Sequence, residues 1–211
     1  MSVKLLLDFD GVVLNNHKLG RYQRDRSAMF VSKHRSMLYA ESKVFNASEY
    51  PKHGHTVIMM NKTKKEIEKP VTLEQYNNFV YSQNQLRLLN RFVDEETYKA
   101  GNKFNEIFTE CDRMRIDWYI FTNAHINWIL HFSKLMDLPV TSQKVIWPYT
   151  IENLKPKRMV YDSIERRFPN SDFVFVDDSD VNFCIPMQRE NWRPVKYKGD
   201  IKDITHALYD F

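Results

Sequence analysis

The chain has 211 residues, 43% of them hydrophobic and 27% charged, which indicates a packed globular core rather than a disordered or low-complexity protein. No apolar run approaches the ~18–20 residues of a membrane span, and the start of the chain is too short a stretch for a secretory leader. Two cysteines, Cys111 and Cys184, are too few for a disulfide framework, so we expect a cytoplasmic protein with no membrane contact.

The formal net charge is +4, and it is unevenly spread along the chain. Residues 17–100 carry a net charge of +6 and the remaining residues carry −2. A basic segment therefore interrupts an acidic remainder, which indicates a segment with its own surface chemistry.

Short apolar runs that end in polar residues predict buried parallel strands. They span 3–8, 118–123 and 173–178, with weaker candidates at 144–147 and 194–197. Helical periodicity lies between them, over 104–111 and again over 160–168. This alternation predicts an α/β protein with a doubly wound, Rossmann-like parallel sheet, in which ligands bind outside the carboxyl ends of the strands.

The interval between Asn16 and Phe121 is much longer than one crossover helix requires. We assign 95–115 to the crossover helix and 17–94 to an inserted, mainly helical cap, so that the core comprises 1–16 and 95–211. Thr72 and Gln75 have the spacing of a capping box that would open a helix through Phe92. The stretch 52–70 is predicted to be a turn or an exposed loop.

Paired carboxylates follow two of the predicted strands. Asp8 and Asp10 project to the same side of an extended chain, so that one could attack a substrate while the other transfers a proton. An ordinary turn is the alternative interpretation. Asp177 and Asp178 end the third run, and unit charges about 4 Å apart repel by about 4 kcal/mol at an effective dielectric constant of about 20. Protonation or a hard cation such as Mg²⁺ would relieve that repulsion, unless the second pair is simply a solvated loop.

Two further segments are suited to an anion. Thr122 and Asn123 follow the second run and precede a predicted helix, so that a hydroxyl and backbone N–H groups could face a phosphate. Lys155 precedes another predicted helix and could neutralise charge on the nucleophile and the phosphate. Taken singly, Thr122 and Asn123 could equally be a simple helix cap, and an ordinary surface lysine is the commoner interpretation of Lys155. Their order along the chain is the more specific signal.

That order resembles the haloacid dehalogenase superfamily over residues 3–16 and 101–198. Four elements carry the resemblance, namely Asp8-Phe9-Asp10-Gly11, Thr122, Lys155, and Val176-Asp177-Asp178-Ser179 with Asn182. Within the superfamily, segments 120–124 and 175–182 look most like the pyrimidine 5′-nucleotidase-type branch. Residues 12–16 depart from that branch, and Trp128 stands where it often has a histidine.

The resemblance implies a role for each matching residue. Asp8 would be the nucleophile that forms an aspartyl-phosphate, and Asp10 the general acid and base. Mg²⁺ would be held by Asp8, the carbonyl of Asp10, Asp178, and Asp177 directly or through water, with Ser179 and Asn182 around them. Thr122, Asn123 and Lys155 would bind the phosphoryl group. A second aspartate at position 10 favours phosphoryl transfer over dehalogenation.

These features predict a Mg²⁺-dependent phosphomonoesterase for a small phosphorylated metabolite, with a nucleotide among the candidates. Rival hypotheses are a polyanionic substrate such as a nucleic-acid end or a phosphoprotein, a phosphomutase, and a non-catalytic binding protein that retains the fold. Candidate substrate contacts in or near the cap are Asn15, Asn16, Arg21, Arg24, Lys52 and His53. For each of them a solvated surface residue is the commoner interpretation.

Overall fold

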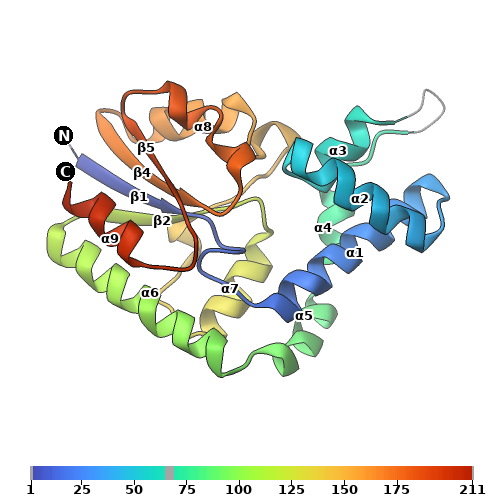
Figure 1. Cartoon of the computed structure of the whole chain (residues 1–211), viewed down its shortest axis with the longest axis horizontal. Coiled ribbons are helices and arrows are strands. Elements are labelled where there is room, and N and C mark those ends of the chain that lie inside the picture. Colours follow the sequence, from blue (N-terminus) through green and yellow to red (C-terminus); the bar gives the residue numbers. More distant parts are fainter. Residues whose placement is uncertain (1, 65–68, 211) are drawn as a thin grey trace.

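The computed structural model describes residues 2–64 and 69–210, and within them a parallel five-stranded sheet carries helices on both faces (Figure 1). The strand order is β3-β2-β1-β4-β5. The strands are β1 (Ser2–Leu7), β2 (Asp117–Phe121), β3 (Val145–Ile146), β4 (Ser171–Asp177) and β5 (Trp192–Lys196). All five apolar runs are therefore strands, which confirms the predicted α/β class.

Alternating side chains of the central strands build a core on each face of the sheet. Leu5 and Leu7 of β1 pack on the face covered by α6 (Glu95–Met114), α7 (Ile126–Leu135) and α9 (Lys202–Tyr209). Leu6 points to the opposite face, which α8 (Arg158–Arg167) covers. This period of two is expected for strands that are buried on both sides.

Helices lie between β1 and α6 and form the predicted cap, which extends from the carboxyl edge of the sheet (Figure 1). They are α1 (His17–Arg35), α2 (Tyr39–His53), α3 (Thr56–Lys62), α4 (Leu73–Val80) and α5 (Gln83–Leu89). The chain returns to the core through a 3₁₀ turn at Asn90–Phe92.

Two predictions inside the cap are wrong. The expected helix over 72–92 begins with the predicted Thr72–Gln75 capping box but ends at Val80, because Ser82 is extended and restarts the chain as α5. Tyr81, at this break, is buried against Trp128 of the core. Packing between cap and core therefore overrides the local helical pattern.

The expected loop at 52–70 is largely helical where the structure describes it. Gly54 has a φ of +70° and ends α2, and the side chain of His55 accepts the N–H of Val57 and caps α3. Helix α3 is buried nearly all round, so it shows no polar face by which a sequence pattern could identify it. Residues 65–68, which belong to the same prediction, lie outside the described residues.

Within residues 2–64 and 69–210 no helix combines the length and the apolar character that crossing a membrane requires. Cys111 is buried, Cys184 is exposed, and neither forms a disulfide.

Candidate active site

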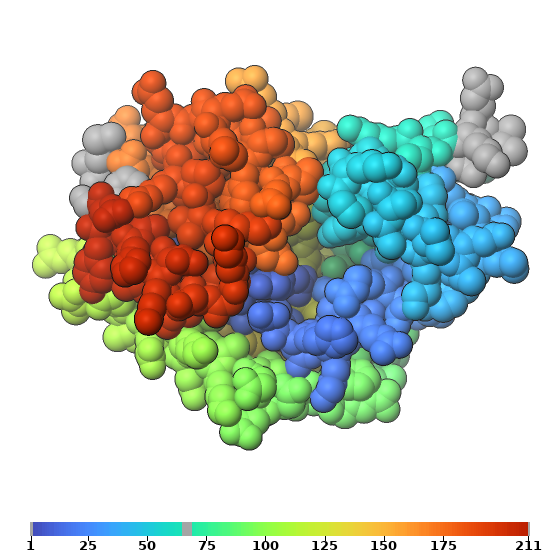
Figure 2. Space-filling model, viewed as in Figure 1, coloured from blue at the N-terminus to red at the C-terminus, as the bar shows by residue number. Residues whose placement is uncertain are grey.

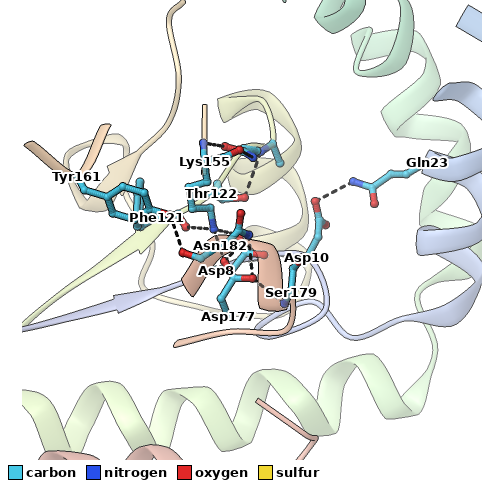
Figure 3. Close-up of polar contacts among 12 residues, drawn as sticks. Asp8, Asp10, Gln23, Phe121, Thr122, Lys155, Tyr161, Asp177, Ser179 and Asn182 are labelled. Carbon is cyan, nitrogen blue, oxygen red and sulfur yellow. Dashed lines mark hydrogen bonds and ion pairs between the residues drawn. The ribbon is translucent and has the colours of Figure 1, made fainter. Parts of the chain in front are cut away.

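The predicted polar residues meet at the carboxyl edge of the sheet (Figure 3). Leu7 of β1 lies opposite Ile120 of β2 and Val176 of β4, so the three strands end at the same level. Asp8, Thr122 and Asp177 come at or directly after these strand ends, and the chain order of the motifs becomes a spatial cluster.

Lys155 is the centre of this cluster. Its side chain is 1% exposed, and its Nζ donates to Asp8 Oδ1 at 3.0 Å, Asp177 Oδ2 at 2.5 Å and the carbonyl of Phe121 at 3.0 Å. All three ammonium hydrogens therefore have acceptors, as a buried charge requires. The ammonium group joins the ends of three strands and offsets part of the negative charge there.

Asp177 is fully buried and held from several sides. The side-chain amide of Asn182 donates to both of its oxygens, at 3.0 and 2.9 Å, and the backbone N–H of Ser179 donates to Oδ1 at 2.8 Å. The Tyr161 hydroxyl in turn donates to the Asn182 carbonyl at 2.8 Å. The two residues predicted to surround the metal ligands therefore fix the position of Asp177, Ser179 through its backbone alone.

Thr122 and Asn123 lie beside the cluster but use their side chains locally. Thr122 Oγ1 accepts the N–H of Ala124 at 3.1 Å. The Asn123 amide donates to the Lys155 carbonyl at 3.0 Å and accepts the Lys155 N–H at 2.8 Å. The side chain of Asn123 is therefore not available for the predicted phosphate contact, because both of its amide atoms are bonded to the backbone of Lys155.

A cation could bind among three of the predicted carboxylates. One oxygen each of Asp8, Asp177 and Asp178 lies within 4.8 Å of the others. Gly11 permits this approach, since its φ is +84° and a Cβ there would lie 2.2 Å from Asp178 Oδ2. Three carboxylates in one site are the hard oxygen ligands that Mg²⁺ prefers.

Burial and mutual repulsion raise the pKa values of Asp8 and Asp178. For Asp8 the largest cause is burial; Lys155 opposes it, and Asp177, Asp10 and Asp178 add to it. Burial and then Asp177 raise the pKa of Asp178. Burial alone would lower the pKa of Lys155, but Asp177 and Asp8 together raise it, so the ammonium stays charged. A site with this excess of negative charge favours a bound cation.

The carboxylate of Asp10 is absent from that three-carboxylate cluster. Its Oδ1 accepts the indole N–H of Trp128 at 2.8 Å, and its Oδ2 accepts the amide of Gln23 at 2.9 Å. Burial raises the pKa of Asp10 to about 6, and the hydrogen bonds from Gln23 and Trp128 oppose the rise. The predicted acid and base is therefore oriented differently from the nucleophile two residues earlier.

Neither partner of Asp10 was predicted from the sequence. The sequence marks Trp128 only as a departure from the nucleotidase-type branch, and it predicts no role for Gln23. The signal for Gln23 is its place between Leu19 and Ser27 on the buried stripe of α1, where residues recur every fourth position. A long amide on such a stripe needs a polar partner in the core.

A cavity of about 900 Å³ separates the sheet edge from the cap. Asp8, Asp10, Thr122 and Lys155 line it from the core. Figure 2 shows the surface hollowed between the core and the cap helices α1 and α2. A volume of this size admits a phosphate together with a sizeable organic group.

The predicted cap contacts fall into different places. Asn15, Arg21 and Arg24 line the cavity and are exposed. Asn16 also borders the cavity, but its side chain caps α1 and donates to the Phe92 carbonyl at 2.9 Å and Thr97 Oγ1 at 2.7 Å. It therefore ties the two chain segments that connect the cap to the core.

Lys52 and His53 do not line the cavity; both lie beside Glu49 on α2. Their predicted contact with substrate is not supported, because α2 continues through these residues and turns them toward its own acidic side chain.

No family model matches this chain, and no curated protein matches it. Among solved structures it is similar to a protein from Burkholderia xenovorans LB400 described as a haloacid dehalogenase-like hydrolase. The sequence identity is 15% and the TM-score is 0.48, over 97% of this chain and 90% of the other. A match at this level identifies neither a family nor an activity for this chain.

Proposed function

We propose that this chain is a Mg²⁺-dependent phosphomonoesterase of the haloacid dehalogenase superfamily, with Asp8 as its nucleophile. One observation carries the proposal: the buried ammonium of Lys155 lies between Asp8 and Asp177 at the floor of the cavity, with Asp178 and Thr122 beside them. A buried cation next to a carboxylate that lines a cavity can stabilise the charge of a transferring phosphoryl group.

The chain's own residues account for both halves of the reaction. An oxygen of Asp8 attacks phosphorus as the bond to the leaving oxygen breaks, and Asp10 gives its proton to that oxygen, which leaves as an alcohol. Water then attacks the phosphorus of the aspartyl-phosphate, Asp10 takes the proton of this water, and inorganic phosphate and free Asp8 result. The Thr122 hydroxyl, whose hydrogen is not used in the contact with Ala124, donates to a phosphoryl oxygen during both steps. Lys155 stabilises the phosphoryl group through its positive charge, because its three hydrogens are bonded to Asp8, Asp177 and the Phe121 carbonyl.

The carboxylate cluster fits Mg²⁺, because Asp8 and Asp178 offer hard oxygen ligands while Asp177 is held by Asn182 and Lys155. Asp8 and Asp178 would bind it directly, together with the predicted carbonyl of Asp10, and Asp177 would support them. When bound, Mg²⁺ neutralises charge on the nucleophile and on the phosphoryl oxygens.

The substrate we propose is a small phosphorylated metabolite, and a nucleotide is one member of that class. Arg21 and Arg24 favour a second candidate, a substrate with another anionic group such as a nucleic-acid end, because both line the cavity on α1. A turnover rate that falls steeply with salt on an oligonucleotide would support this candidate. The two unpaired cysteines are consistent with the cytoplasmic location that we also propose.

Hydrolysis of an aryl phosphate in the presence of Mg²⁺ tests the proposal. We expect activity that a chelator removes and that Asp8→Asn abolishes. Asp180→Asn is the matched control, because Asp180 is exposed and pairs with Lys196 outside the cluster. An inactive wild-type protein that still binds phosphate would support a non-catalytic binding protein instead. Movement of the phosphoryl group between two hydroxyls of a sugar phosphate, without release of inorganic phosphate, would support a phosphomutase.

A further inference from the structure

Asp10 is held by two donors that come from different parts of the molecule. Trp128 belongs to α7 of the core, is fully buried, and packs against Phe132 and Tyr81. Gln23 belongs to α1 of the cap and reaches Asp10 across the cavity (Figure 3). One hydrogen bond to the carboxylate therefore comes from a core helix, while the other requires α1 of the cap to lie over the core.

The two donors differ in chemistry. An indole N–H can only donate, so the oxygen it contacts, Asp10 Oδ1, stays an acceptor in either protonation state. The proton that Asp10 gives and takes back is then carried by Oδ2, the oxygen that Gln23 contacts. The Gln23 amide N–H can stay bonded to a lone pair of Oδ2 whether or not this oxygen carries the proton, which leaves the proton itself free to point toward the substrate.

We propose that Gln23 is a positioning residue supplied by the cap, which orients Oδ2 of Asp10 toward the leaving oxygen of the substrate. The inference rests on the proposed function, because it assigns a helper to Asp10 in that reaction. It predicts that proton transfer is efficient only while α1 lies against the core. With the Trp128 hydrogen bond alone, the carboxylate of Asp10 could rotate about this single contact and Oδ2 would lose its orientation.

Dependence of the rate on the leaving group tests this role directly. An activated aryl phosphate departs as a stable phenolate and needs little help from an acid, whereas an alkyl phosphate needs a proton on its leaving oxygen. We expect Gln23→Leu to lower kcat on the alkyl ester by roughly 10- to 100-fold and on the aryl ester by less than about threefold. KM should change little on either ester.

Gln85→Leu is the matched control. Gln85 is also a half-buried glutamine of the cap, but it accepts a hydrogen bond from Tyr22 within the cap rather than reaching Asp10. This variant should lower kcat on both esters by the same factor or leave kcat unchanged on both. Gln23→Asn, whose side chain is too short for its amide to reach Asp10, should show the same selective loss of kcat on the alkyl ester as Gln23→Leu. Because it keeps a polar side chain, it also tests the proposal if Gln23→Leu does not fold.

Equal losses on both esters in the Gln23 variants, or a rise in KM alone, would overturn the inference, because the first indicates a structural role and the second a substrate contact. Asp10→Asn separates this failure from failure of the proposed function. If Asp10→Asn loses the alkyl ester selectively while Gln23→Leu does not, the acid is Asp10 but Gln23 does not position it. If wild type hydrolyses neither ester, the proposed function itself fails.

Discussion

Replacing Gly11 by alanine changes the candidate metal site without touching a ligand. The added Cβ would lie 2.2 Å from Asp178 Oδ2 and 2.5 Å from its Cγ, whereas ordinary contacts begin near 3.4 Å. The carboxylate of Asp178 must therefore move by about 1 Å. Mg²⁺ holds its ligands at about 2.0–2.1 Å with little tolerance of angle, so a displacement of this size removes Asp178 from coordination.

We expect Gly11→Ala to weaken Mg²⁺ binding at least tenfold, since even the loss of supporting contacts around a metal costs roughly 10- to 100-fold in affinity. Calorimetric titration with Mg²⁺ and the Mg²⁺ dependence of aryl phosphate hydrolysis both measure the effect. Because catalysis depends on the same ion, activity at saturating substrate should recover only at much higher Mg²⁺.

The chain contains a suitable control for backbone strain. Gly199 has a φ of +98°, similar to the +84° of Gly11, but a Cβ there would meet nothing within 4 Å. Both alanine variants should lose roughly 1–2 kcal/mol of stability from the left-handed conformation, and only Gly11→Ala should lose Mg²⁺. Equal Mg²⁺ affinity in Gly11→Ala and wild type would refute the assignment of Asp178 as a ligand.

Other substitutions test the burial and charge relations of the site. Lys155→Met leaves Asp8 and Asp177 without their buried cation and should lower the free energy of unfolding in urea by about 3–5 kcal/mol. The loss should be smaller in acid, where the carboxylates are protonated. An unchanged urea midpoint at neutral pH would contradict the buried pairing. Burial lowers the pKa of His55 from 6.5 to about 3, so the unfolded chain takes up this proton first as pH falls. The stability that neutral His55 contributes is therefore complete above about pH 6.5, is lost as pH falls toward 3, and should be about 2 kcal/mol smaller at about pH 5; His55→Gln should flatten this dependence, and an equally steep profile would show that other groups cause it. Asn16→Ala removes the cap of α1 and should lower the free energy of unfolding by about 1–2 kcal/mol, with faster proteolysis between cap and core. Wild-type stability in this variant would show that neither the helix cap nor the hydrogen bonds of Asn16 to Phe92 and Thr97 stabilise the fold.

The strands and the order of the chemical groups could be predicted from the sequence. Short apolar runs ended by polar residues have few other interpretations in an α/β chain, and the strand order then brings Asp8, Thr122 and Asp177 to one edge. Lys155 could be included because it follows the same order, although its burial among three acceptors could not be foreseen.

Contacts across the cavity could not be predicted, because they depend on how the cap lies over the core. Gln23 is more than a hundred residues from Trp128, and no local pattern indicates that both reach Asp10. Tyr81 ends α4 for the same kind of reason, since its place against the core outweighs helical propensity. Asn123 likewise has its partner in a distant loop.

The identity of the nucleophile is tested most directly by trapping the covalent intermediate. Protein quenched in acid during turnover of an aryl phosphate, then digested and analysed by mass spectrometry, should carry one phosphoryl group on the peptide that contains Asp8. The adduct should be absent from Asp8→Asn. A phosphoryl group on a different residue, or steady turnover with no adduct at any quench time, would contradict nucleophilic attack by Asp8.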